Sequence, residues 1–405
     1  LGRGGKGLYA LDVTTPATFD GSKALWEVSG SDDDMGFITS RPIITKANNG
    51  STVVIVSNGL NSTNDDPALF IYDLFTGTRL AKLLPIEKGG NDVFDNNGLS
   101  AATGVDQDVD GDVDYMYAGD MKGNVWKFDL SDNNPNNWEV ANNDYPLYSA
   151  KDSTGTITQS ISGGIAIGFD AEFNPWLYFG TGRYLTAGDP STTSVQTWYG
   201  IVDESTNTTI AGRGALKARK IVAAGELDNG SGTGVKVRAF EPQEFPSGVS
   251  DMYGKKGWYI DLVNPPFTAA QKVGERIVGT PVVRGTTVLV SSIIPSEDPC
   301  TVEGSGYVNA VDALTGSSGV YGSESYFDVN GGGFDNDKLV STIDGREISI
   351  GSIDLGIKMP TDALVLAGDT NELVVVGGSI GGTGSAPFRG TRAVGRISWH
   401  EMINN

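Results

Sequence analysis

The chain has 405 residues, a length that fits several small domains or one large closed β-architecture. Its formal net charge of −21 argues against a nucleic-acid-binding protein, which needs a positive surface. Glycine is abundant, with 56 residues, and short Val/Ile/Tyr/Trp runs alternate with Gly, Asn, Asp and Ser, so the pattern predicts an all-β fold.

One strand pattern recurs along the chain: apolar and aromatic residues that end at Asp and run into a turn. We call it the signature strand. Its separations of about 50 to 90 residues suit a four-stranded propeller blade plus insertions, because stacked blades bury both faces of each sheet. Copies lie at 8–12, 69–73, 125–129, 198–203, 257–261 and 307–312, with a degenerate copy at 393–399.

Further strands are expected where a blade needs them. Segments 41–44 and 52–59 precede the second signature strand, and segments 279–283 and 287–291 precede the sixth. Thr-Gly turns follow two signature strands, at 76–77 and 315–316. We therefore predict a single β-propeller domain over residues 1–405, with six or seven blades.

The first blade is predicted to lack its inner strands, since the first signature strand stands at the start of the chain. This blade is either truncated or completed from elsewhere. The abrupt opening on a strand indicates a fragment of a longer protein. No signal peptide or transmembrane segment is recognisable in the sequence.

Two insertions interrupt the blade pattern, at about 210–246 and 323–346. The first carries an island of basic residues in an acidic chain, and the second is rich in Gly, Asp and Asn. We expect both to be blade-edge loops or hairpins, and unstructured decoration rather than functional surfaces. The basic residues are Lys217, Arg219, Lys220, Lys236 and Arg238.

The most informative segment is the acidic loop, residues 106–114, which reads D-x-D-x-D-G-x-x-D. Five carboxylates surround a glycine that permits a sharp turn, and such a loop repels itself unless a cation lies inside it. The residues after it, 115–120, read as a strand and not as the exit helix of an EF-hand. We therefore predict an EF-hand-like Ca²⁺ loop inserted into β-structure.

The spacing assigns each ligand. Positions 1, 3 and 5 place the carboxylates of Asp106, Asp108 and Asp110 on the ion, and position 7 contributes the backbone carbonyl of Asp112. Asp114 at position 9 supplies a direct oxygen in place of the Glu that EF-hands carry at position 12. An oxygen-only anionic set disfavours zinc and copper.

A weaker acidic segment lies at 328–337, with Asp328, Asn330, Asp335 and Asp337 as candidate oxygen ligands. Its spacing does not fit a standard calcium loop, and a flexible turn is the preferred interpretation. Whether it binds a second ion stays open.

Catalytic patterns are missing. The one histidine, His400, follows a tryptophan near the C-terminus, and no Ser-His-Asp or Cys-His arrangement forms without it. Cys300 is the one cysteine, so an internal disulfide is excluded and its partner is either absent or outside this chain. Residues 2–7 match G-x-G-x-x-G, but a strand follows them where a dinucleotide site needs a helix. The sequence predicts a protein that is not an enzyme.

Several segments resemble one known family, the C-terminal β-propeller of the PilC/PilY proteins of bacterial type IV pili. They are the acidic loop with its continuation to 130, and residues 5–13, 179–185 and 395–399. The resemblance implies that Ca²⁺ is held by Asp106, Asp108, Asp110, the Asp112 carbonyl and Asp114. It departs at Arg3-Gly4-Gly5, where some members carry Arg-Gly-Asp.

The resemblance also implies a function: a calcium-binding pilus protein that controls type IV pilus assembly and retraction, twitching motility and surface adhesion. Its partners would be minor and major pilins and a host cell receptor. Its place would be the pilus tip and cell surface, reached through the periplasm, either outer-membrane-associated or secreted.

Two other functions are kept as alternatives. A quinoprotein dehydrogenase propeller would need a central pocket for quinone and calcium. A glycan-binding propeller lectin would need an exposed aromatic platform, with Trp176, Trp198 or Trp258 as the candidates.

Overall fold

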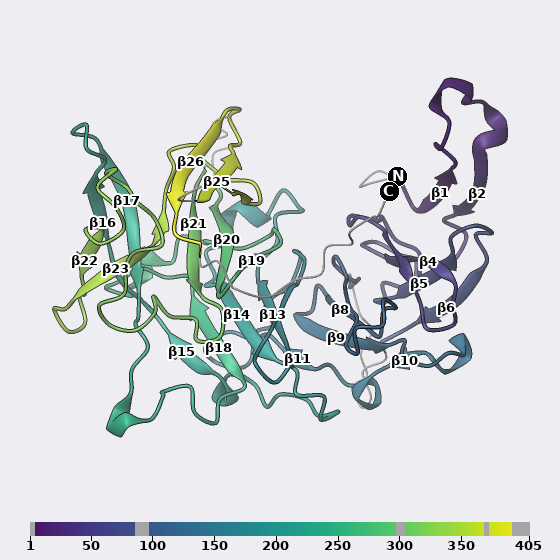
Figure 1. Ribbon diagram of the computed structural model, residues 1–405, viewed down its shortest axis with the longest axis horizontal. Coiled ribbons are helices and arrows are strands. Elements are labelled where there is room, and N and C mark those ends of the chain that lie inside the picture. The colour runs from purple at the N-terminus through teal and green to yellow at the C-terminus, as the bar shows by residue number, and fades with distance from the viewer. Residues whose placement is uncertain (1–4, 86–96, 297–303, 368–371, 391–405) are drawn as a thin grey trace. The chain divides into compact units, whose positions relative to one another are not determined.

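The computed structural model describes residues 5–85, 97–296, 304–367 and 372–390. Within these ranges every long element is a β-strand and the helical segments are short 3-10 turns, so the all-β prediction is confirmed (Figure 1). The chain divides into two compact units. Unit 1 comprises Leu1–Lys151, Thr158–Ile165 and Thr206–Ile210, and unit 2 comprises Asp152–Ile157, Ala166–Ser205 and Ala211–Asn405.

Unit 1 contains two antiparallel sheets of the expected blade type and one two-stranded ribbon. The ribbon pairs β1 (Gly7–Leu11) with β2 (Ala24–Ser29). The first sheet has the order β3 (Ile43–Lys46), β4 (Thr52–Ser57), β5 (Leu69–Asp73) and β6 (Arg79–Leu83). The second has the order β7 (Thr103–Val105), β8 (Tyr115–Gly119), β9 (Asn124–Asp129) and β10 (Glu139–Val140), and β11 (Tyr148–Ser149) also pairs with β9.

Unit 2 contains three sheets. The first has the order β12 (Ala166–Phe169), β13 (Pro175–Gly180), β14 (Thr197–Val202), β18 (Gly257–Asp261) and β15 (Lys217–Arg219). The second has the order β16 (Ile221–Asp228), β17 (Gly234–Phe240), β23 (Glu347–Ile353), β21 (Ser305–Asp312), β20 (Thr287–Ile294) and β19 (Val282–Arg284), with β22 (Lys338–Val340) paired to β23. The third has the order β24 (Leu364–Leu366), β25 (Glu372–Gly377) and β26 (Thr383–Phe388).

Both faces of the central strands β4 and β5 are buried. On one face Ile55 and Ile71 pack in a cluster with Trp126 and Phe128 of the neighbouring sheet. On the other face, alternate residues such as Phe70 pack toward the β1–β2 ribbon. Because successive side chains of a strand point to opposite faces, this double burial explains why β4 and β5 read as nearly continuous apolar runs.

Six of the seven signature strands fall on observed strands: β1, β5, β9, β14, β18 and β21. The seventh, 393–399, lies outside the described residues. One assumption behind the blade count is wrong, because β14 and β18 carry separate copies and yet pair in one sheet, with Trp198 opposite Ile260. A signature strand therefore does not mark a separate sheet each time.

Among the described residues, β1 pairs with β2 alone in a two-stranded ribbon. An apolar cavity of about 770 Å³ lies beside the ribbon, lined among others by Leu11, Leu25 and Ile44.

The first insertion is ordered, which corrects the expectation of unstructured decoration. It forms β15 and the β16–β17 hairpin, and β17 pairs with β23 inside the second sheet of unit 2. Two residues of its basic island are buried in bidentate ion pairs, Arg219 with Asp251 and Arg238 with Glu275. The second insertion contributes β22 and otherwise consists of turns.

The two Thr-Gly turns share one construction. Asp312 Oδ1 accepts hydrogen bonds from the Thr315 backbone N–H at 2.9 Å and from its hydroxyl at 2.8 Å. Gly316 has φ +64°, and the ring of Trp258 lies against it while its Nε1–H donates to the carbonyl of Ala313 at 2.7 Å.

The turn after β5 repeats these contacts. Asp73 accepts from Thr76, Gly77 has φ +69°, and Trp26 donates to the carbonyl of Leu74 at 2.7 Å. A tryptophan thus fastens each turn to a strand that comes from a different part of the sequence.

We predict that Gly316→Ala destabilises the protein more than Gly356→Ala. Both glycines have positive φ, +64° and +71°, so the backbone cost of about 1 kcal/mol is shared. A Cβ at 316 meets Cδ2 of Trp258 at 2.3 Å, whereas one at 356 meets nothing within 4 Å. Overpacking should cost about 1–3 kcal/mol more at 316. Thermal unfolding of both variants measures this difference, and equal midpoints would contradict the packing argument.

Candidate metal centre

The acidic loop connects β7 to β8 as the turn of a β-hairpin. Val105 pairs with Tyr115 at the base of the hairpin, and Val105 before the loop and Val113 within it are both buried. Within it, Gly111 has φ +100° and Val109 has φ +67°. The glycine thus takes a conformation that L-residues rarely adopt, as its place at position 6 predicts.

Three of the four carboxylates predicted as ligands converge. Asp106, Asp108 and Asp114 each offer one carboxylate oxygen, and these oxygens lie within 4.8 Å of one another. Asp114 is buried, Asp106 is half-buried and Asp108 is exposed. The pKa of Asp108 lies above its ordinary value, through desolvation and through the negative charges of Asp114 and Asp110. The loop therefore gathers charge that nothing in its own sequence neutralises.

Asp110 and Asp112 do not belong to this converging group. The Asp110 side chain is exposed and accepts a hydrogen bond from the Asp112 N–H at 2.8 Å. The Asp110 N–H in turn donates to Asp106 at 3.1 Å and to Asp108 at 3.2 Å. The pKa of Asp112 is raised by partial burial and by the charge of Asp110, with Lys46 opposing it.

Asp114 is the best-anchored carboxylate of the loop. Its Oδ2 accepts from the Gln107 N–H at 2.7 Å, which closes the loop, and its Oδ1 accepts from Nδ2 of Asn48 at 3.2 Å. Asn48 Nδ2 also lies 3.0 Å from the carbonyl of Val113 and 3.1 Å from that of Leu130. One side chain from the β3–β4 turn thus holds the end of the acidic loop.

A backbone contact strengthens this junction. Val113 N–H donates to the carbonyl of Lys46 at 3.0 Å, and Ala47 forms a parallel bridge with Val113. The acidic loop is therefore joined to the β3–β6 sheet as well as to its own. Sequence reasoning missed Asn48, because it lies 66 residues from Asp114 and carries no motif of its own.

The donor set fits a hard divalent cation. All three converging groups are carboxylates. Among the described residues, no other three His, Cys, Asp or Glu side chains bring their ligand atoms within 4.8 Å of one another. Hard cations such as Ca²⁺ prefer oxygen ligands and accept irregular geometry, whereas zinc favours nitrogen and sulfur. When bound, a cation would supply the positive charge that the loop lacks.

Other candidate residues are placed differently. Trp176, Trp198 and Trp258 are only 7%, 0% and 0% exposed, so they fill the core of unit 2 and offer no open aromatic face. Cys300 and His400 lie outside the described residues.

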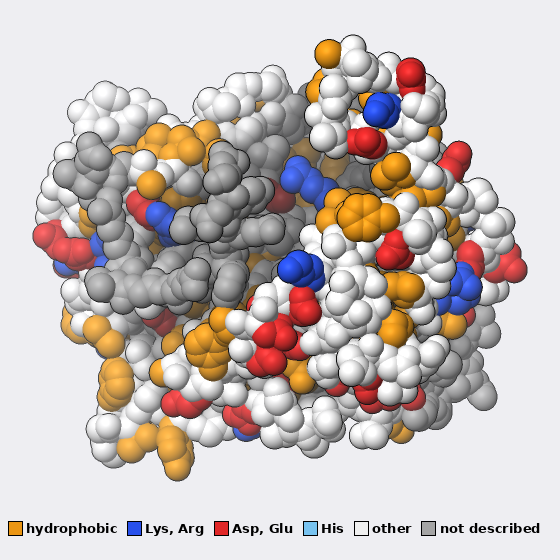
Figure 2. All heavy atoms as spheres, turned by 45° about the vertical axis from the view of Figure 1, so that its right-hand side comes forward, with side chains coloured by type: hydrophobic (Ala, Val, Ile, Leu, Met, Phe, Trp, Pro, Cys, Tyr) orange, Lys and Arg blue, Asp and Glu red, His pale blue; other side chains and the backbone are white. Residues whose placement is uncertain are grey.

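On the face shown in Figure 2, acidic side chains gather in small groups among polar surface. No helix in the described ranges is long and apolar enough to cross a bilayer.

A buried carboxylate in the next turn was not anticipated by the sequence analysis. Asp120, in the β8–β9 turn, is fully buried and accepts from the Asn124 N–H at 2.8 Å and from Nε1 of Trp126 at 2.8 Å. Burial raises its pKa. Asp170 repeats the arrangement with Asn174 and Trp176. Both turns share the spacing Asp-x-x-x-Asn-x-Trp, and this repeat is the sequence signal that could have predicted them.

Comparison with known proteins defines the class first. Residues 1–230 match the family model described as the PilY1 beta-propeller domain. The solved structure of the Pseudomonas aeruginosa PilY1 C-terminal domain superposes with a TM-score of 0.76 at 27% identity, and covers 95% of this chain and 78% of that one. The fold is thus a β-propeller, as the recurrence of signature strands predicted.

The curated relatives narrow the class. A Type IV pilus biogenesis factor PilY1 homolog of Xylella fastidiosa is 37% identical over 329 residues, which is 78% of this chain and 21% of that protein. The Pseudomonas aeruginosa PAO1 factor PilY1 is 32% identical over 343 residues, 78% of this chain and 28% of that protein. This chain therefore belongs to the PilY1 β-propeller family, and it spans less than a third of the length of these relatives.

We predict that Asn48→Ala lowers stability by about 1–3 kcal/mol, because three acceptors lose their shared donor and Asp114 loses a partner. Asn49→Ala is the matched control, since Asn49 accepts only the local N–H of Ser51 within its turn. Urea unfolding of both variants provides the measurement. A loss at Asn49 as large as that at Asn48 would contradict the role assigned to the Asn48 clamp.

Proposed function

We propose that this chain is the calcium-binding propeller module of a type IV pilus biogenesis factor, and that ion occupancy of the acidic loop controls pilus assembly and retraction, and with them twitching motility and surface adhesion. The observation that carries the proposal is the convergence of Asp106, Asp108 and Asp114 in a chain of the PilY1 family. The proposed ligands are these three carboxylates, the Asp110 side chain and the Asp112 carbonyl.

Electrostatics explain why an ion would alter the loop. Two like charges about 4 Å apart repel by about 1 kcal/mol in a water-like dielectric and by several times more where burial lowers it. Asp114 is 5% exposed, so its repulsion with Asp106 and Asp108 is poorly screened. A divalent cation reverses the sign of these interactions and draws the loop together.

The anchoring of Asp114 extends this effect beyond the loop. Asn48 and the Ala47–Val113 bridge join the loop end to the β3–β6 sheet. An ion that orders Asp114 therefore also stabilises the junction of two sheets in unit 1. A partner that contacts this junction would find it ordered with calcium and loosened without it.

The proposed partners are the minor and major pilins, and a host cell receptor for adhesion. The proposed location is the pilus tip and cell surface. These assignments rest on the relatives named as type IV pilus biogenesis factors.

The non-enzymatic interpretation is preferred to a quinoprotein dehydrogenase. The converging carboxylates come from one contiguous hairpin loop, whereas a quinone–calcium pocket draws its groups from several blades. The lectin alternative loses its platform, since the three candidate tryptophans are buried.

We predict that the purified chain binds Ca²⁺ at the acidic loop and that Asp114→Asn abolishes binding there. Asp112→Asn is the matched control: it removes the same charge from the same loop but leaves the proposed carbonyl ligand in place. Calcium at 100 times its Kd should stabilise the wild type and Asp112→Asn by about 2.7 kcal/mol, and should not stabilise Asp114→Asn in the same way. Calorimetric titration and thermal unfolding supply both readouts. Equal weakening by the two substitutions would show that only net charge matters.

In the full-length protein, we predict that Asp114→Ala changes the number of surface pili and reduces twitching motility, while the protein is still exported. Pilus counts by electron microscopy and twitching-zone diameters measure the effect, with Asp112→Asn as the control strain. Normal piliation and motility in an Asp114→Ala strain whose protein has lost calcium would remove the regulatory role of the ion.

A further inference from the structure

We propose a second divalent-cation site in unit 2, in the loop 328–337, with side-chain oxygens from Asp328, Asn330 and Asp337 as ligands. This segment joins the strand-like run at Phe327 to β22 and lies in the second insertion. The proposal is independent of the pilus function, because it concerns a different loop in a different unit.

The observation that points to a ligand is an orphaned oxygen. Asp337 is 0% exposed, and its Oδ1 has no hydrogen-bond partner among the described residues. Its other oxygen, Oδ2, accepts the Val329 N–H at 3.2 Å, which places the carboxylate beside the first residues of the loop. Leaving a buried polar atom without a partner costs about 1–3 kcal/mol, more for a charged group, and a bound cation would compensate this cost.

The nearest ionic neighbour increases this cost. Burial raises the pKa of Asp337, the hydrogen bond from the Val329 N–H lowers it, and the negative charge of Asp328 raises it. The negative charges of Asp328 and Asp337 therefore repel each other, and a cation between them would be attracted by both.

The hydrogen bonds of this loop resemble those of the acidic loop. At the first position, Asp328 accepts the N–H groups of Gly331 and Gly333, as Asp106 accepts those of Asp110 and Gly111. These bonds turn the backbone around the first carboxylate in both loops. They describe a turn and would not by themselves identify an ion.

The third and last positions follow the same scheme. Asn330 Oδ1 accepts the Gly332 N–H at 2.7 Å, as Asp108 accepts the N–H two residues later. The closing carboxylate of each loop accepts the N–H of the second loop residue: Asp337 from Val329, and Asp114 from Gln107. The second loop is one residue longer, which explains why its spacing does not match the standard pattern.

The rest of the fold fixes both ends of the loop. The Asp328 N–H donates to the carbonyl of Pro387 in β26 at 3.3 Å, and the Asp337 carbonyl accepts from Ile350 in β23 at 3.1 Å and from the Ser325 hydroxyl. Asp337 is therefore held in place by the core of unit 2. A cation would bind between this fixed carboxylate and the more exposed Asp328.

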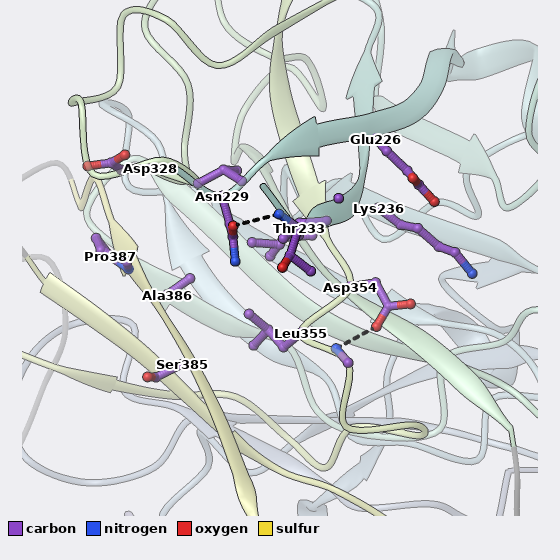
Figure 3. A pocket seen from close by; sticks show the side chains of 15 residues that line it. Glu226, Asn229, Thr233, Lys236, Asp328, Asp354, Leu355, Ser385, Ala386 and Pro387 are labelled. Atoms are coloured by element: carbon purple, nitrogen blue, oxygen red, sulfur yellow. Dashed lines mark hydrogen bonds between the residues drawn. The ribbon is translucent and has the colours of Figure 1, made fainter. Parts of the chain in front are cut away.

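A route to the site exists. Asp328 and Val329 line a cavity of about 620 Å³ that is also lined by Asn229, Asp354 and Glu226. In Figure 3, Asp328 lies at one edge of this cavity, with Glu226, Lys236 and Asp354 on the opposite side. The acidic lining favours entry of a cation, and the cavity has room for the water molecules that would complete the coordination of Ca²⁺.

The ligand set indicates a site weaker than the acidic loop. Two carboxylates and one amide oxygen balance the charge of one divalent ion, whereas the acidic loop brings more negative charge together. Fewer charged ligands lower the affinity for Ca²⁺. We therefore expect two binding steps of unequal affinity.

The test is the stoichiometry of Ca²⁺ binding to the intact 405-residue chain, measured by equilibrium dialysis with radioactive calcium. The wild type should bind two ions, and Asp337→Asn and Asp328→Asn should each bind one. Asp335→Asn is the matched control, since Asp335 is an exposed carboxylate of the same loop, and it should still bind two. Asp114→Asn should remove the tighter ion and leave the weaker.

A second readout covers the case in which a variant folds poorly. Without calcium, Asp337→Asn should raise the unfolding midpoint because it removes an uncompensated buried charge; with saturating calcium it should lower the midpoint relative to the wild type. Asp328→Asn, at a half-exposed position, tests the site without altering a buried group.

Three outcomes would overturn the proposal: one ion per wild-type chain that is lost in Asp114→Asn, two ions retained by both Asp337→Asn and Asp328→Asn, or a stabilisation of Asp337→Asn that calcium does not reverse. The first of these leaves the function proposed for the acidic loop intact. If Asp114→Asn loses the tighter ion and keeps the weaker one, the two sites are separate, as proposed.

Discussion

Burial of sheets on both faces is the constraint from which the rest of the structure follows. The central strands β4 and β5 of the β3–β6 sheet pack Ile55 and Ile71 toward one neighbour and Phe70 toward the other, so they have no polar face. Charged side chains in this sheet are found on the outer strands β3 and β6 and at the end of β5. The acidic loop lies at a hairpin end, and Asn48 fastens it to the adjacent sheet.

The tryptophan-fastened turns meet the same constraint in another way. A turn between strands leaves carbonyl groups that water cannot reach once a neighbouring strand packs against it. Trp26 and Trp258 cover these turns and donate to the carbonyls of Leu74 and Ala313. Asp73 and Asp312 satisfy the N–H groups on the inner side of the same turns. The same few residues therefore shield each turn with an apolar ring and supply hydrogen bonds to its backbone N–H and C=O groups.

What the sequence predicts well is local. Signature strands are recognisable because apolar alternation has a period of two, and the acidic loop is recognisable because its carboxylates lie close together in the sequence. Pairing between distant segments was not predictable from one sequence. This explains why the shared sheet of β14 and β18 was missed, and why Asn48 escaped notice although it holds Asp114. The loop at 328–337 was read as a plain turn because its spacing is off by one residue, and the isolation of Asp337 shows only in three dimensions.

The buried guanidinium groups of the β16–β17 region have a consequence for any shortened form of this protein. Arg238 forms a buried ion pair with Glu275, and Arg219 forms one with Asp251. Deleting residues 217–240, which form β15 and the β16–β17 hairpin, would leave Asp251 and Glu275 without these cationic partners, and removing one partner of a buried ion pair costs about 3–5 kcal/mol. The segment is therefore an integral part of its folding unit. A shortened propeller must either keep it or replace both Asp251 and Glu275 with neutral residues.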